Sequence, residues 1–119
     1  MKLLVTGAAG FIGSNFVRMI AKGDLQGIHG VKVLDKLTYA GVKENLSAAI
    51  DYPNYRFIQG DICDSIQVTE QISEVDAVVN FAAESHVDRS ITGAADFVQT
   101  NIVGVQVLLD AIKASRREI

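Results

Sequence analysis

Val5-Thr6-Gly7-Ala8-Ala9-Gly10-Phe11-Ile12-Gly13 is the stretch that decides the fold of this chain. It follows two leucines and leads into an amphipathic segment, so a strand must stop at Gly7 and a helix must begin soon after. The first turn of such a helix presents unpaired N–H groups and a positive dipole end, which attract an anion such as a pyrophosphate. We expect Gly7 to permit the tight turn, Gly10 to let the phosphate approach the backbone, and Gly13 to let the helix lie close to the sheet.

The spacing of these glycines is Gly-x-x-Gly-x-x-Gly, with Ala8 standing where the simplest dinucleotide fingerprint has its second glycine. Spaced glycines also serve ordinary turns, so on their own they are weak evidence. The strand before them and the helix after them carry the prediction of a dinucleotide site.

Composition limits the class of protein. The 119 residues fit one domain, and 49% hydrophobic with 21% charged residues is typical of a folded protein. The net charge of −3 argues against a nucleic-acid or membrane surface, and no apolar run approaches the ~20 residues that span a bilayer. Because the chain starts on a core strand, we expect no signal peptide and a cytoplasmic location. A single cysteine, Cys63, excludes an internal disulfide and a thiol metal cluster, and we expect it to be a reduced, partly buried thiol and no metal to be bound.

Four apolar runs, at residues 2–6, 31–35, 55–58 and 76–81, alternate with helical patterns at 11–21, 42–50 and 65–72. That alternation predicts an α/β fold with a parallel sheet. Right-handed crossovers give the strand order 3-2-1-4, the first half of a Rossmann-like doubly wound sheet. No fifth strand covers the apolar fourth one, so we expect residues 1–119 to be the N-terminal, dinucleotide-binding portion of a longer protein, without its substrate-binding part.

Helix faces follow from the same periodicity. The first helix has an apolar face made of Phe11, Ile12, Phe16, Val17 and Ile20. Asp64 and Gln67 form a plausible capping box for the helix at 65–72.

A last helix begins after Asp88 or Gly93 and runs to about Ser115. Its apolar stripe should lie on the sheet and consists of Val98, Ile102, Val105, Leu109 and Ile112. Asn101 and Gly104 are poor helix formers inside it. Either Gly104 allows close packing, or Asn101 distorts the helix or bonds a neighbouring strand near the site.

Acidic residues after the second and third strands complete the predicted cofactor site. Asp35 stands where a carboxylate accepts hydrogen bonds from the adenosine ribose and repels a 2′-phosphate, which favours NAD over NADP. Lys36 could attract a 2′-phosphate or be a solvated loop charge. Asp61 can accept from the adenine amino group while the Ile62 N–H donates to the ring, or Asp61 can simply order the turn before Asp64.

Small and polar residues follow the fourth strand. Phe81 precedes Ala82 and Ala83, which leave room for a bulky cofactor against the backbone. The polar residues Glu84, Ser85 and His86 should cluster beyond the carboxyl end of the sheet, where ligands bind in open α/β folds. His86 could be an acid, a base or a phosphate donor, or an ordinary hydrogen-bonded loop residue.

Four strings of this sequence, at residues 6–13, 34–41, 60–64 and 81–91, resemble the extended short-chain dehydrogenase/reductases, and among them the nucleotide-sugar dehydratases. The resemblance covers essentially the whole chain. It implies that the pyrophosphate lies along Phe11 and Ile12, the ribose against Asp35, Lys36, Leu37, Thr38 and Gly41, the adenine against Asp61 and Ile62, and the rest of the NAD along Phe81, Ala82, Ala83, Glu84, Ser85 and Thr100. It also implies that Ser85 and His86 face a nucleotide sugar, and that the enzyme is a homodimer to which the last helix could contribute.

The chemistry that the resemblance implies is an internal redox cycle. Hydride leaves C4 of the sugar for NAD, water is eliminated across C5 and C6, and the hydride returns to C6. In the family a Tyr-x-x-x-Lys pair, a threonine and an Asp-Glu pair perform it, and these would lie beyond Ile119, so we expect no catalytic residue in this segment and no activity from it alone. Tyr39 and Lys43 have the spacing of the pair, but they follow the second strand, on the adenosine side, and Gly41 interrupts the helix that would align them. A related nucleotide-sugar epimerase or dehydratase and a stand-alone NAD-sensing module remain the alternatives.

Overall fold

A four-stranded parallel sheet forms the centre of the computed structural model, which describes residues 1–39, 41–85, 91, 93–115 and 118–119. Its strands are β1 (Lys2–Thr6), β2 (Gly30–Asp35), β3 (Tyr55–Gln59) and β4 (Ala77–Asn80), in the order β3-β2-β1-β4. All three pairings are parallel. The predicted fold class and strand order are confirmed, and each strand lies within one residue of its predicted bounds.

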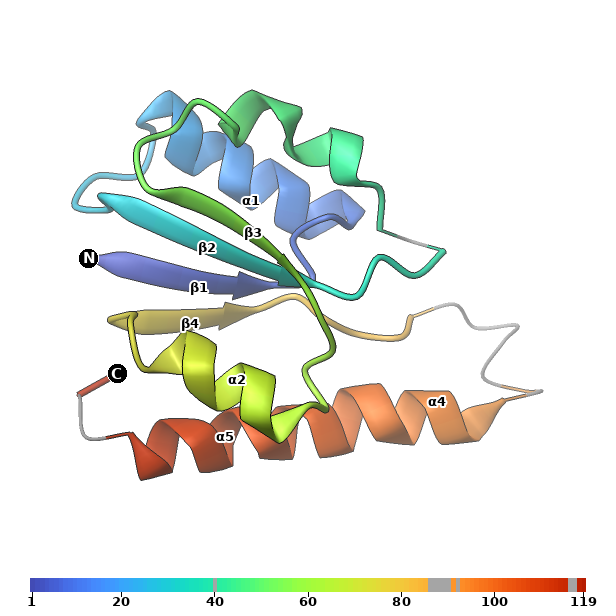
Figure 1. The fold of residues 1–119 in the computed structure, drawn as a ribbon. Coiled ribbons are helices and arrows are strands. Elements are labelled where there is room, and N and C mark those ends of the chain that lie inside the picture. The colour runs from blue at the N-terminus through green and yellow to red at the C-terminus, as the bar shows by residue number, and fades with distance from the viewer. Residues whose placement is uncertain (40, 86–90, 92, 116–117) are drawn as a thin grey trace.

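Helices cover both faces of the sheet (Figure 1). One face carries α1 (Phe11–Lys22) and the 3₁₀ helix η1 (Lys43–Ala49). The other carries α2 (Ser65–Ile72) and a long last helix made of α4 (Ala94–Val98), a π-helical turn η2 (Gln99–Gly104) and α5 (Val105–Ala114). The sequence predicts a helix over residues 42–50, and the structure has there the tighter 3₁₀ form, at Lys43–Ala49. None of the helices in the described ranges is both long and apolar enough to cross a membrane.

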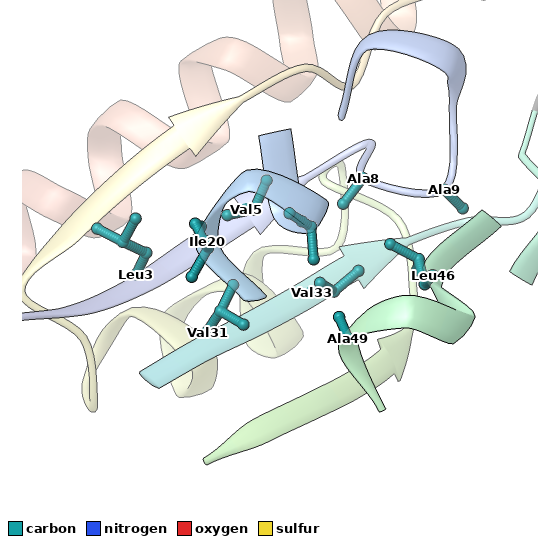
Figure 2. Packing of buried hydrophobic residues seen from close by; sticks show 10 residues of the cluster. Leu3, Val5, Ala8, Ala9, Ile20, Val31, Val33, Leu46 and Ala49 are labelled. Carbon is teal, nitrogen blue, oxygen red and sulfur yellow. The ribbon is translucent and has the colours of Figure 1, made fainter. Parts of the chain in front are cut away.

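Two apolar clusters hold these layers together, one on each face of the sheet. Alternate residues of β1 face opposite sides, so Leu3 and Val5 join the cluster beneath α1 and η1, and Leu4 joins the cluster beneath α2 and α5. Figure 2 shows the first cluster, in which Ile20 of α1 and Leu46 of η1 meet the strands. The carboxyl ends of the strands remain outside both clusters, where they can bind a ligand.

The apolar face of α1 differs from its predicted composition. Val17 and Ile20 are buried and Phe16 packs against Phe81, with ring centroids 5.4 Å apart. Phe11 and Ile12, by contrast, are 92% and 67% exposed. They occupy the first turn of the helix, beyond the end of the sheet, so no core layer lies beneath them.

The predicted stripe of the last helix is largely wrong. Its buried residues are instead Gly104, Leu108 and Ala111. Val98, Ile102 and Leu109 are 50%, 62% and 56% exposed, while Val105 and Ile112 are half-buried. A π-turn contains an extra residue and therefore shifts the phase between the two parts of a helix, which a constant period of 3.6 residues cannot anticipate.

Candidate dinucleotide-binding site

A cleft of about 460 Å³ lies across the carboxyl ends of all four strands. Its lining residues are Gly7, Gly10, Phe11, Ile12, Gly13, Leu34, Asp35, Lys36, Thr38, Gly41, Gly60, Asp61, Ile62, Phe81, Ala82, Ala83, Glu84, Ser85 and Thr100. The structure thus brings together every described residue predicted for the site except Leu37. His86 lies outside the described residues. Leu34 and Gly60 were not predicted as site residues. The position of Gly60, directly after the third predicted strand, could have indicated that it lies at the cleft.

The glycine turn packs closely against neighbouring backbone, both its own and that of the segment after β4. Gly7 has φ +64°, and a Cβ there would lie 2.3 Å from the Ala82 nitrogen. A Cβ on Gly13 would lie 2.5 Å from the Gly7 carbonyl oxygen, so Gly13 lets α1 lie close to the turn that directly follows β1. A Cβ on Gly10 would meet only that same oxygen, at 3.4 Å. Gly10 therefore leaves space on the cleft side of the backbone.

The N-termini of α1 and α2 are built differently. At α2 the Asp64 carboxylate accepts from the Ile66 and Gln67 N–H groups, both at 3.1 Å, as predicted. At α1 the N-cap is Gly10, and no side chain caps the helix. The uncapped N–H groups and the dipole of α1 are thus available to an anion in the cleft.

Only half of the predicted capping box forms at α2. The Gln67 Nε2 donates to the Gln59 carbonyl at 3.3 Å. The Asp64 N–H, which the box would pair with the Gln67 side-chain oxygen, donates instead to the Asp61 carbonyl at 3.0 Å. The Gln67 side chain occupies the place that a Cβ on Gly60 would need, 1.7 Å from that position. Gly60 therefore admits the Gln67 side chain to the end of β3.

Asp35 is a buried carboxylate held by two backbone N–H groups. Its Oδ2 accepts from Ala9 at 2.7 Å and its Oδ1 accepts from Leu37 at 2.8 Å. Leu37, at φ 56°, thus contributes its N–H to Asp35, while its side chain packs against the cluster beneath α1. Since each carboxylate oxygen has two lone pairs, Asp35 keeps acceptor capacity toward the cleft.

Lys36 and Asp61 form an ion pair across the ends of β2 and β3, with Nζ 2.6 Å from Oδ2. The hydrogen bond that the Lys36 ammonium donates to the Asp61 carboxylate raises the pKa of Lys36 above its ordinary value. Partial burial would raise the pKa of Asp61, but the Lys36 hydrogen bond and charge and the Cys63 N–H lower it overall. Both groups are therefore charged at neutral pH. Asp61 does order the turn, since its Oδ1 accepts from Cys63 N at 2.9 Å, and its contact with adenine stays a prediction.

Cys63 is half-buried, as predicted. Its thiol donates to the Gln99 carbonyl at 3.3 Å, and burial raises the pKa of the thiol. This contact joins the turn after β3 to the start of η2.

Asn101 fastens the segment after β4 to the last helix. Its Oδ1 accepts from the Glu84 N–H and its Nδ2 donates to the Glu84 carbonyl, both at 2.8 Å. A Cβ on Gly104 would lie 2.5 Å from Ile62 Cδ1, so the glycine lets the Ile62 side chain pack closely against the helix. Gly104 therefore allows close packing, and Asn101, within the π-turn, bonds the loop after β4 and not a strand.

Tyr39 and Lys43 contact different partners, and that they are not a catalytic pair stays a prediction. The Tyr39 hydroxyl donates to Glu84 Oε2 at 3.1 Å, whereas Lys43 Nζ lies 4.9 Å from the centre of the Phe57 ring. The Tyr39–Glu84 contact links the loops after β2 and β4, and sequence reasoning missed it. Within the described part of the chain, no group of three or more His, Cys, Asp or Glu residues could hold a metal ion.

Comparison with known proteins gives consistent matches. The model of a family described as GDP-mannose 4,6 dehydratase matches residues 4–119. The curated dTDP-glucose 4,6-dehydratase of Streptomyces niveus is 56% identical over 118 residues, which make up 98% of this chain and 35% of that protein. The resemblance stated from the sequence is thereby confirmed.

Solved structures show the same fold. A dTDP-glucose 4,6-dehydratase from Streptomyces venezuelae with NAD bound matches with a TM-score of 0.94 and 48% identity, covering 99% of this chain and 37% of that one. A UDP-glucose 4-epimerase from Brucella ovis in complex with NAD matches with a TM-score of 0.79 and 32% identity, covering 97% and 33%. This chain therefore spans about a third of the length of its relatives.

Proposed function

This chain belongs to the GDP-mannose 4,6 dehydratase family, and on that premise we propose that it is the NAD-binding portion of a dTDP-glucose 4,6-dehydratase. The dehydratases from the two Streptomyces species are 56% and 48% identical to it, against 32% for the epimerase. That difference supports the dehydratase over the epimerase as the parent activity. NAD in the related structures supports NAD as the cofactor.

One observation carries the cofactor proposal. The uncapped N-terminus of α1 and the buried Asp35 carboxylate line the same cleft, and a backbone hydrogen bond from Ala9 to Asp35 joins them. An anion-binding group and a ribose acceptor are thus held in fixed relation before any ligand arrives. A dinucleotide needs both, with the pyrophosphate at the helix and the adenosine ribose at the carboxylate.

The residues of this chain would bind and orient the cofactor. Gly10 lets the pyrophosphate reach the α1 backbone, and Phe11 supplies exposed apolar surface beside it. Ala82 and Ala83 offer small side chains along the nicotinamide half, and Ser85 and His86 would face the nucleotide sugar. When bound, NAD supplies reversible hydride acceptance, and in this proposal the residues that move protons belong to the remainder of the enzyme, outside residues 1–119.

The test has two parts, binding and turnover. Titration calorimetry with this chain should show one NAD bound per chain, and absence of binding would refute the cofactor proposal. Turnover is measured on the enzyme at the length of its relatives, with dTDP-glucose deuterated at C4. A dehydratase yields a product lighter by one water with the label at C6, whereas an epimerase conserves the mass.

We also propose that the parent enzyme is a cytoplasmic homodimer in which the last helix contributes to the contact. Val98, Ile102 and Leu109 leave half or more of their surface exposed, and an apolar patch of this kind is typical of an interface. Sedimentation of the enzyme should give the mass of a dimer. Replacement of Leu109 by glutamate should lower the sedimenting mass toward that of the monomer. An unchanged dimer would show that this face of the last helix is not the interface.

A further inference from the structure

The Lys36–Asp61 ion pair stands beside the group that selects the ribose. Lys36 directly follows Asp35, and both line the cleft. In dinucleotide sites a cation near this position accommodates the 2′-phosphate of NADP. Here the Lys36 ammonium is paired with Asp61 at 2.6 Å, although the lysine side chain is 59% exposed. The long, exposed side chain of Lys36 is thus held at Asp61.

Asp61 is the fixed member of the pair. Its Oδ1 accepts from Cys63 N at 2.9 Å, and its own carbonyl accepts from Asp64 N at 3.0 Å. These bonds orient the carboxylate so that Oδ2 meets Lys36. The flexible lysine therefore adapts to Asp61, and its position depends on that carboxylate.

We propose that Asp61 selects NAD over NADP by holding the Lys36 ammonium away from the place that a 2′-phosphate would occupy. Asp35 then discriminates by repulsion and Asp61 by withholding the neighbouring cation. A carboxylate offers about four lone-pair sites, so Asp61 can hold Lys36 and still accept from an adenine amino group. The inference rests on the proposed cofactor function and adds a residue that determines its specificity.

The decisive variant is Asp61→Asn. The asparagine keeps an oxygen for the Cys63 N–H and places a neutral amide against Lys36. NAD and NADP share the adenine, so any lost adenine contact cancels in the ratio of their dissociation constants. In titration calorimetry of the chain at low salt, the ratio should shift about three- to fivefold toward NADP, the size of one exposed charge pair. The shift should shrink as added salt screens the freed ammonium.

Lys36→Met separates restraint of the lysine from simple loss of a negative charge. In the Lys36→Met background, Asp61→Asn should change the ratio by less than about twofold. Equal shifts in both backgrounds would mean that Asp61 acts through its own charge alone, and no shift in either would mean that Lys36 cannot reach a 2′-phosphate. Each of these outcomes overturns the inference.

Two controls keep the outcome interpretable. Asp61→Ser, which also retains an oxygen for Cys63 N, should reproduce the shift if the asparagine variant folds poorly, and its failure to do so overturns the inference. Wild-type protein that binds NAD while the variants show no shift leaves the proposed function standing and refutes only the role of Asp61. Wild-type protein that binds neither dinucleotide refutes the proposed function, and the inference with it.

Discussion

Replacing Asn101 with alanine should loosen the segment after β4 and weaken NAD binding. The change removes both hydrogen bonds to Glu84, each 2.8 Å long. Two such bonds contribute about 1–3 kcal/mol, and alanine recovers roughly 0.5 kcal/mol of helix propensity. Because the bonds are exposed, we expect a net loss near the lower end, about 1 kcal/mol. That corresponds to a fall of roughly 4 °C in Tm.

Binding should weaken for a related reason. Glu84 and Ser85 line the cleft, so a segment left free in the variant must be ordered when NAD binds. An ordering cost of about 1 kcal/mol corresponds to a roughly fivefold increase in Kd. Asn101→Asp keeps the acceptor for the Glu84 N–H and loses the donor to its carbonyl, so its Kd should fall between wild type and Asn101→Ala.

Gln106→Ala is the matched control in the same helix. It removes an amide whose Nε2 donates to Asp110 at 2.9 Å, away from the cleft. Calorimetry should show a stability change of a few tenths of a kcal/mol and no change in NAD affinity. If Asn101→Ala and Gln106→Ala bind NAD equally well, the Asn101–Glu84 contact does not support the site and the reasoning is wrong.

Three other changes test the turn, the cap and the charge pair. Gly13→Ala places a Cβ 2.5 Å from the Gly7 oxygen and 2.7 Å from Ala8 Cα, which are backbone atoms that cannot move aside easily. Thermal melts should therefore show that the free energy of unfolding falls by about 2 kcal/mol or more. A variant as stable as the wild type would contradict this packing. Asp64→Ala removes the α2 cap and should cost about 1 kcal/mol in denaturant unfolding with NAD affinity unchanged, and a lost affinity would count against a purely structural cap. Because the pKa of Asp61 is lower in the folded chain than in the unfolded one, its carboxylate stabilises the fold above about pH 4 and loses this effect as pH falls through the lowered pKa. The free energy of unfolding of the wild type should exceed that of Asp61→Asn by less than about 1 kcal/mol at pH 6 and equal it near pH 2. The same difference at both pH values would refute the pairing.

The parallel sheet and most of the site were predictable because both depend on local patterns. Apolar runs and glycine positions predicted where the strands begin and end. The residues that follow parallel strands share one edge of the sheet. Gly7, Asp35 and Glu84 are far apart in sequence but line the same cleft, as their positions after three parallel strands predict.

The errors have a common physical origin in contacts between elements. Gln67 fills the space over Gly60, which no pattern within α2 could reveal. The buried face of the last helix depends on a π-turn where Gly104 meets Ile62. The sequence marks Gly104 as an unusual residue inside a helix, but it does not show which face of the helix is buried after the π-turn.

The most direct measurement is a titration of the ¹⁵N-labelled chain with NAD followed by NMR. The backbone N–H signals of Gly10, Phe11 and Ile12 at the start of α1 should shift together with that of Ser85 after β4. Arg56, at the opposite end of the sheet from the cleft, should not shift. Shifts centred on the cleft with Arg56 unchanged are the predicted result. No shifts, or shifts confined to the Arg56 end, would contradict a dinucleotide site at the glycine turn.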